Sequence, residues 1–172
     1  EFILRTGSWL LARFLYQIDF KGTDHIPKYG PALIVANHAS FIDWLLITAV
    51  CQRPVRFVVD YRTFTKPFYN WFFLCGKCIP FATEEENKQI YDAACEQISK
   101  ALAAGNLLCM FPERAITKNG EIKAFAAEIE QILVKNDVDI IPIGLSGLWG
   151  SLFSLKKQGK LTLVHKNKRR KI

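Results

Sequence analysis

The sequence predicts an α/β domain in which a mixed sheet of short strands is flanked by helices, preceded by an amphipathic membrane-interface helix at the N-terminus. Short apolar runs alternate with longer segments whose apolar residues recur every three to four positions, which is typical of strands and helices in one layered domain. The chain has 172 residues, of which 50% are hydrophobic, so it can bury one core without metal ions or disulfides. We expect a helix over 1–20, a main domain over 21–165 and a basic tail over 166–172.

The N-terminal segment, residues 2–20, contains several leucines and aromatic residues, and its only charged residues are Arg5, Arg13 and Asp19. This composition is typical of a helix that lies in a membrane interface. A helix packed on the domain's own core has the same pattern, so both interpretations remain open. The sequence has no uninterrupted apolar run of about 18 residues, and we therefore expect no membrane-spanning helix.

Four short apolar runs predict the strands of the sheet, at residues 32–36, 55–59, 107–111 and 139–145. The first of them is bounded by Pro31 and Asn37, as expected for a short buried strand. Proline cannot donate a backbone hydrogen bond, so Pro142 indicates that the last strand lies at an edge or is irregular.

Two segments between these runs have helical periodicity. The clearer one spans residues 84–104, begins with three glutamates that suit the helix dipole, and is followed by a glycine that acts as a stop signal. The second is predicted over 124–134, with Phe125, Ile129 and Leu133 on one face.

Charge and cysteine content restrict the partners and the compartment. The formal net charge is +7, which predicts attraction to anionic surfaces such as phospholipid headgroups, nucleic acids or acidic carrier proteins. The five cysteines form an odd number and lie in or beside apolar stretches, which indicates a reducing, cytoplasmic setting. Cys75 and Cys78 have zinc or redox spacing but no second pair completes a site, so we expect no metal.

The segment Asn37-His-Ala-Ser-Phe-Ile-Asp43 contains the strongest candidate for chemistry. In a continuous helix, His38 and Asp43 would point about 140° apart, so they can meet only if His38 lies in a loop and Asp43 in the first helical turn. Asp43 could then hold one imidazole nitrogen while the other accepts a proton from a substrate hydroxyl, as a general base does. Ser40 and Asp43 also match a capping box that only begins a helix, and this alternative remains open.

Three blocks of the sequence resemble the PlsC-type glycerolipid acyltransferase family. NHASFID at residues 37–43 is similar to the N-H-x-S-x-x-D block of that family, residues 111–113 to its F-P-E-G block, and residues 141–143 to its V-P-I block. The resemblance runs from about Arg13 to Phe153. It is nearest to acyltransferase domains that are fused to a lipid transporter and an acyl-carrier-protein synthetase.

The resemblance implies an acyltransferase with His38 as the base and Asp43 as its orienting partner. It implies substrate-binding residues at Asn37, Ser40, Phe111, Pro112, Glu113 and Arg114, with Glu113 in the wall of the acceptor site. No metal or cofactor is implied, because acyl carrier protein or coenzyme A enters as the acyl thioester co-substrate. The implied partners are lysophospholipid and membrane lipids but not nucleic acid, and the implied location is the cytoplasmic face of the bacterial inner membrane.

The sequence departs from the family at positions that bear on the acceptor. Arg114 occupies the place of the glycine after Phe-Pro-Glu, and Ala115 lacks the arginine that many members use to meet phosphate. Phe81 lies roughly where another arginine is expected, and Glu128 replaces a glycine. A second hypothesis is therefore a catalytically impaired lipid-binding module of the same fold.

A third hypothesis, a nucleic-acid-binding domain, rests on aromatic residues that interleave with arginines and a lysine between residues 53 and 73. A membrane-facing surface or core packing accounts for them equally well. We rank this hypothesis last because no recognised binding motif accompanies the pattern.

Overall fold

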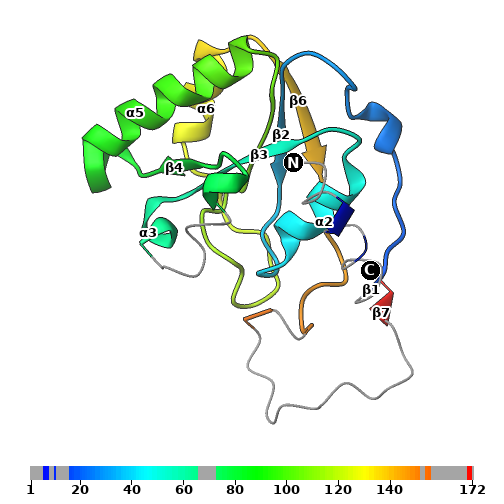
Figure 1. The fold of residues 1–172 in the computed structure, drawn as a ribbon. Helices are drawn as coiled ribbons and strands as arrows, with labels where there is room; N and C mark the ends of the chain where they lie inside the picture. Colours follow the sequence, from blue (N-terminus) through cyan, green and yellow to red (C-terminus); the bar gives the residue numbers. More distant parts are fainter. Residues whose placement is uncertain are drawn as a thin grey trace.

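The computed structural model describes residues 6–7, 10, 16–65, 73–151, 154–155 and 170–171. In chain order the elements are β1 (Tyr16–Gln17), the 3-10 helix η1 (Thr23–His25), β2 (Ala32–Ala36), α2 (Asp43–Val50), β3 (Val55–Asp60), α3 (Tyr61–Phe64), β4 (Ile79–Phe81), α5 (Glu84–Ala103), β5 (Leu107–Met110), α6 (Glu128–Lys135), β6 (Asp139–Ile143) and β7 (Arg170–Lys171) (Figure 1). The α/β class is as predicted.

The main sheet has five strands in the order β4-β3-β5-β2-β6, and all its neighbouring strands are parallel. The prediction of a mixed sheet was therefore wrong. The chain returns to the same end of the sheet through α2 between β2 and β3, through α5 between β4 and β5 and through α6 between β5 and β6, and such helical crossovers produce parallel pairing. All the carboxyl ends of these strands consequently lie along one edge.

Helices cover both faces of the sheet (Figure 1). Leu33 and Leu108 pack in the cluster that α5 and α6 cover, whereas Ile34 and Cys109 pack with Ile47 of α2 on the other face. A strand buried on both faces is apolar along its whole length, and all four residues of β5 are buried. At the sheet edge, β6 has no fully buried residue, which confirms the edge position that Pro142 predicted.

The predicted helices differ in accuracy. The helix expected over 84–104 is α5, whose first turn is closed by a capping box between Thr83 and Glu86. The helix expected over 124–134 begins only at residue 128, and Phe125 is 60% exposed rather than on a buried face. The preceding residues 124–126 are not helical, and the Ala126 N–H donates to the Pro112 carbonyl 3.0 Å away in the loop after β5.

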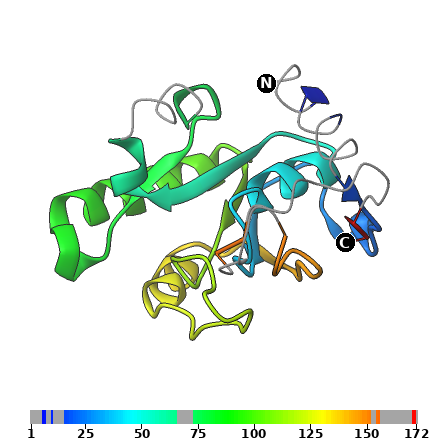
Figure 2. The ribbon, with the colours of Figure 1, turned by 90° about the horizontal axis from the view of Figure 1, so that it is seen from below.

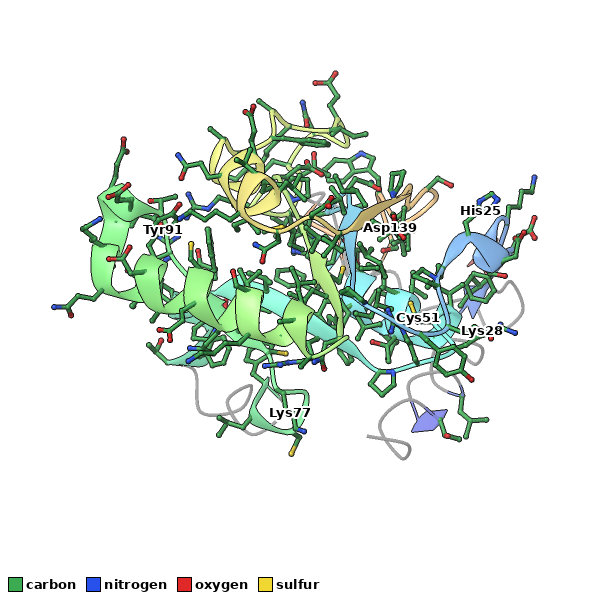
Figure 3. All side chains as sticks on the ribbon, turned by 90° about the horizontal axis from the view of Figure 1, so that it is seen from above. His25, Lys28, Cys51, Lys77, Tyr91 and Asp139 are labelled. Carbon is green, nitrogen blue, oxygen red and sulfur yellow. The ribbon has the colours of Figure 1, made fainter. Side chains whose placement is uncertain are left out.

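The two helices on the same face are joined through Tyr91. Figure 3 shows Tyr91 between α5 and α6, and its hydroxyl donates to Oε1 of Gln131 at 2.5 Å. Strand β4 was missed in the sequence because it is only three residues long and contains Pro80. Its partner in the sheet is β3.

The predicted N-terminal helix lies largely outside the described residues, as do most residues of the predicted basic tail. Within the described part, β1 pairs in parallel with β7, so a helix cannot continue to residue 20. This boundary was wrong because Tyr16–Gln17 is extended to meet Arg170–Lys171. None of the helices in the described ranges combines the length and apolar character that a membrane crossing requires.

Candidate active site

The candidate site lies at the carboxyl edge of the sheet, where the neighbouring strands β2 and β5 end. Residues 37–43 follow β2 and residues 111–114 follow β5, and the two strands are parallel. The arrow of β6, parallel to β2, points downward in Figure 1, so Figure 2, seen from below, presents this edge with the start of α2 beside the loops. Ligand sites of parallel α/β sheets lie at this edge.

His38 and Asp43 meet as their spacing predicted. His38 lies in the loop after β2, Asp43 is the first residue of α2, and His38 Nδ1 is 2.8 Å from Asp43 Oδ2. A carboxylate can only accept, so Nδ1 carries the proton and the other ring nitrogen, Nε2, has a free lone pair. The Asp43 side chain is fully buried and the His38 side chain is 21% exposed, so the ring remains reachable for a substrate.

The ring of His38 is also held by stacking. It lies against the ring of Phe111, with centroids 4.2 Å apart and an interplanar angle of 17°. Phe111 in turn is aligned with Phe57 of β3 at 6.4 Å. Of the predicted substrate-binding residues, Phe111 therefore contacts the His38 ring directly.

The carboxylate of Asp43 also orders the turn that bears His38. Its Oδ2 accepts the main-chain N–H groups of Ala39 at 2.7 Å and Ser40 at 2.9 Å. Ser40 is not the N-cap of α2, because Ile42 precedes the first helical residue and no side chain caps that end, and the oxygen that accepts the Ser40 N–H also holds His38. The capping box that the sequence offered as an alternative is therefore not formed at α2, and the Asp43 carboxylate instead holds the turn and the His38 ring together.

The main chain of His38 is held from the loop after β5. Its N–H donates to Glu113 Oε1 at 2.8 Å, and its carbonyl accepts the N–H of Thr117 at 2.9 Å. The second oxygen of Glu113 accepts the Lys123 N–H at 2.9 Å. Glu113 is 7% exposed, and it lies beside His38 with a hydrogen bond to each of its carboxylate oxygens.

These contacts restrict where an oxyanion could be stabilised. The amides of His38, Ala39 and Ser40 all donate to carboxylate oxygens. An N–H group that is already committed to a carboxylate is a poor donor for a developing oxyanion. The main-chain amides of His38, Ala39 and Ser40 are thus unsuited to stabilise an oxyanion.

Three other predicted residues shape the site. The side-chain amide of Asn37 donates to the Leu145 carbonyl at 2.9 Å and accepts its N–H at 2.6 Å, which ties the end of β2 to the loop after β6. Ser40 and Pro112 are buried. In the conformation described here, these residues support the loops.

Arg114 has a strained backbone. Its φ is 57°, in the left-handed region that favours glycine, which explains physically why a glycine suits this position. Its guanidinium lies 2.5 Å from Glu86 Oε2, and Arg62 lies 3.3 Å from the other oxygen of the same carboxylate. Arg62 also pairs with Asp60 at the end of β3.

The charges of this cluster shift two pKa values. The N–H of Thr83 and then the guanidinium groups of Arg114 and Arg62 lower the pKa of Glu86. Partial burial raises the pKa of Asp60, but its bonds to Arg62 outweigh burial and the net shift is downward. Both carboxylates are therefore favoured in their charged form.

The structure brings His38, Asp43, Phe111 and Glu113 together, while the side chain of Arg114 turns to α5. Sequence reasoning missed Thr117 and Lys123, which act through main-chain N–H groups that residue type does not reveal. It also missed Glu86, although the T-x-x-E spacing of Thr83 and Glu86 was a usable capping-box signal. Across the described ranges, no cluster of three or more His, Cys, Asp or Glu residues could hold a metal ion.

Fold and site together define an α/β domain with a histidine and a buried aspartate at the carboxyl edge of its sheet. Residues 17–146, more than half of the chain, match the protein family described as Acyltransferase. The chain belongs to this acyltransferase family. The family predicted from the three sequence blocks is thereby confirmed.

Curated relatives carry a more specific name. A 1-acyl-sn-glycerol-3-phosphate acyltransferase of Chlamydomonas reinhardtii is 27% identical over 85% of this chain and 43% of its own length. The "Probable 1-acyl-sn-glycerol-3-phosphate acyltransferase" of Mycoplasma pneumoniae is 25% identical over 88% of this chain and 59% of its own length. The chain thus spans about half the length of these relatives.

A solved structure has the same fold. The 1-acyl-sn-glycerophosphate acyltransferase PlsC of Thermotoga maritima superposes with a TM-score of 0.66 at 21% identity, over 80% of this chain and 54% of that chain. The parallel α/β sheet with flanking helices is therefore shared with PlsC.

Proposed function

We propose that this chain is an O-acyltransferase that moves a fatty acyl group from acyl carrier protein or coenzyme A to a lysophospholipid or 1-acylglycerol 3-phosphate. The observation that carries the proposal is the 2.8 Å contact between His38 Nδ1 and Asp43 Oδ2, which leaves Nε2 as a proton acceptor. The names of the relatives support the class of acceptor. The reaction would serve phospholipid synthesis or remodelling.

The chemistry needs one base and no covalent enzyme intermediate. His38 Nε2 takes the proton of the acceptor hydroxyl while the hydroxyl oxygen attacks the thioester carbonyl. The buried carboxylate of Asp43 stabilises the positive charge on the ring and keeps its orientation, as in other His–Asp pairs. When the carbon–sulfur bond breaks, the departing thiolate takes the proton from Nε2, and an ester and a free thiol result.

The donor is proposed from charge. Acyl carrier protein has an acidic surface and coenzyme A carries phosphates, and both suit a chain with a formal net charge of +7. The thioester is already activated, so positioning the hydroxyl against its carbonyl supplies much of the remaining barrier reduction. In this mechanism the thioester is a co-substrate and no separate cofactor takes part.

A membrane surface is the proposed place of the reaction, at the cytoplasmic face of the bacterial inner membrane. Phe41, between His38 and Asp43 in the chain, is 55% exposed. Ile122 is 65% exposed, and it directly precedes Lys123, whose N–H shares the Glu113 carboxylate with His38. Exposed apolar side chains beside a site for lipid substrates favour contact with a bilayer.

Vesicle binding tests this placement. Phe41→Ser should weaken sedimentation with vesicles of anionic phospholipid. Tyr29→Ser is the matched control, because Tyr29 is 87% exposed in the loop before β2, at the opposite edge of the sheet. Equal loss in both variants would contradict a membrane contact at the active-site edge.

The likeness to acyltransferase domains of transporter and acyl-carrier-protein synthetase fusions supports a further proposal, that this chain works as one domain of a larger membrane protein. The chain spans about half the length of its curated relatives. Expression together with flanking sequence, followed by comparison of transfer rates, tests this proposal.

The test of the enzyme is acyl transfer from radiolabelled acyl carrier protein and acyl-coenzyme A to a panel of lysolipids in detergent micelles. His38→Ala should abolish transfer. His25→Ala is the matched control, because His25 is an exposed histidine whose side chain lies 3.9 Å from Asp24 in η1. Loss of transfer in both variants, or in neither, would refute a base at His38.

One observation favours a second function, a lipid-binding module without turnover. At the position where the family has glycine, Arg114 has a long cationic side chain and a strained backbone conformation. If the chain binds vesicles but is silent in the transfer assay, and Arg114→Gly is silent too, the second function is supported. Activity in Arg114→Gly alone would identify an impaired acyltransferase.

A further inference from the structure

We infer that Glu113 is a positioning residue for the base and not part of the acceptor-binding wall, an inference that rests on the proposed role of His38. Glu113 Oε1 accepts the His38 N–H at 2.8 Å and Oε2 accepts the Lys123 N–H at 2.9 Å. The residue is 7% exposed. With both oxygens engaged and little surface, the carboxylate has little capacity left for an acceptor headgroup.

The carboxylate joins the loop after β2 to two points of the loop between β5 and α6. Glu113 itself follows β5, His38 follows β2, and Lys123 lies in the loop before α6. Thr117, from the same loop, holds the His38 carbonyl at 2.9 Å, so both polar groups of the His38 backbone are fixed from the β5 side. Asp43 holds the ring through Nδ1 and the N–H groups of the two residues that follow, but it contacts neither polar group of the His38 backbone.

The position of His38 Nε2 therefore depends on two carboxylates. Asp43 sets the rotation of the imidazole ring by its bond to Nδ1, and Glu113 sets the position of the His38 backbone by its bond to the N–H. Transfer rates fall steeply when a reacting group moves by about 1 Å, by as much as about a hundredfold. A defect at Glu113 should thus slow the chemical step without weakening acceptor binding.

The geometry also explains why a carboxylate suits this position. Two N–H donors approach from two segments, and only a carboxylate offers an acceptor oxygen to each. An amide would present an NH₂ group to one of them, and an unmade bond at a buried donor is costly. Burial of the charge is offset because hydrogen bonds to an ionised acceptor are stronger than neutral ones.

Steady-state kinetics with varied acceptor concentration separate the two roles. For Glu113→Gln we expect kcat to fall about ten- to a hundredfold. The KM for the acceptor should stay within about twofold, with the same result for lysolipids of different headgroup. The matched control is Glu121→Gln, because Glu121 is an exposed glutamate of the same loop whose carboxylate meets Asn119. The control should retain the parent kcat.

Glu113→Asp tests geometry against charge. It keeps the negative charge but withdraws the carboxylate by one methylene, so it cannot reach both N–H groups, and we expect a loss of kcat like that of Glu113→Gln. A rise in acceptor KM with kcat preserved at saturation, or full rescue by Glu113→Asp, would overturn the inference. If Glu113→Gln does not fold, Glu113→Asp carries the kinetic test alone.

Amide hydrogen exchange keeps this test independent of turnover. In Glu113→Gln the peptide that contains His38 and the peptide that contains Lys123 should exchange faster, while β5 keeps its protection. Unchanged exchange in both peptides would overturn the inference even if the parent proves inactive. Lack of transfer by the parent, with faster local exchange in the variant, would refute the proposed function and leave the positioning contact intact.

Discussion

Replacing Arg114 separates backbone strain from the ion pair at one position. At a φ of 57°, any residue other than glycine has a conformational energy about 1–2 kcal/mol higher than in the usual right-handed region. Glycine removes that strain but loses about 0.5–1 kcal/mol more conformational entropy on folding. The pair with Glu86, whose side chains are 28% and 31% exposed, contributes about 0.5 kcal/mol once solvent screening is included.

These terms predict an order of stability. Arg114→Ala keeps the strain and loses the pair, so it should be about 0.5 kcal/mol less stable than the parent. Arg114→Gly loses the pair but relieves the strain, so it should exceed Arg114→Ala by about 1 kcal/mol, or about 2–4 °C in melting temperature. Urea unfolding followed by circular dichroism measures both differences.

A double-mutant cycle with Glu86→Gln checks the ion pair separately. Glu86→Gln should cost less in the Arg114→Ala background than in the parent, because the pair is already absent there. If Arg114→Ala is as stable as Arg114→Gly, the left-handed backbone at this position is not strained and the reasoning is refuted.

Three further predictions concern other parts of the fold. Gly120→Ala should lower the unfolding free energy by about 1–3 kcal/mol, measured by urea melts, because a Cβ there would lie 2.7 Å from Trp149 Cδ1 at a φ of 88°. In alkylation followed by peptide mass spectrometry, exposed Cys75 should react first. Cys109 should react last, because burial raises its thiol pKa. On acidification from about pH 6 to about pH 3, the parent should lose more stability than Glu86→Gln. The pKa of Glu86 is lower in the folded than in the unfolded protein, so its charged carboxylate stabilises the fold above the unfolded pKa. That contribution is lost as the pH falls through the folded pKa.

Each of these has its own control. Gly144→Ala should be nearly neutral, because a Cβ there meets nothing within 4 Å, and an equal loss at both glycines would show that close packing is not the cause. Cys51, with a pKa raised to about 12 by burial, should be protected like Cys109, and early labelling of Cys51 would contradict the described core. Parallel acid curves for the parent and Glu86→Gln would exclude Glu86 as a source of the pH dependence.

The sequence predicted the parts of the fold that short apolar runs and helical periodicity encode. It located β2, α5 and the meeting of His38 with Asp43, because a five-residue spacing allows only one geometry between a loop and a first helical turn. It also contained an unused signal for parallel pairing. Residues 107–110 are apolar without alternation, as in a strand that is covered on both faces.

Other features had no signal in residue type. The hold on His38 from Thr117 and Lys123 uses main-chain N–H groups, which every residue except proline carries. The family resemblance implied that Glu113 lies in the wall of the acceptor site. Its contacts with two backbone segments depend on how the loop after β5 folds back, which the local sequence does not encode. The left-handed backbone of Arg114 likewise depends on the turn and not on the side chain.

The bond between Asn37 and Leu145 has a consequence for biosynthesis. These residues are 108 positions apart, so this contact closes only after most of the domain has been synthesised. At ribosomal rates of about 5–20 residues per second, the segment that bears the base waits roughly 5–20 s for its last tether. Until β5 has been synthesised, the apolar strand β2 has neither of its neighbours beside it, and a nascent chain in this state depends on chaperones or rapid completion to avoid aggregation.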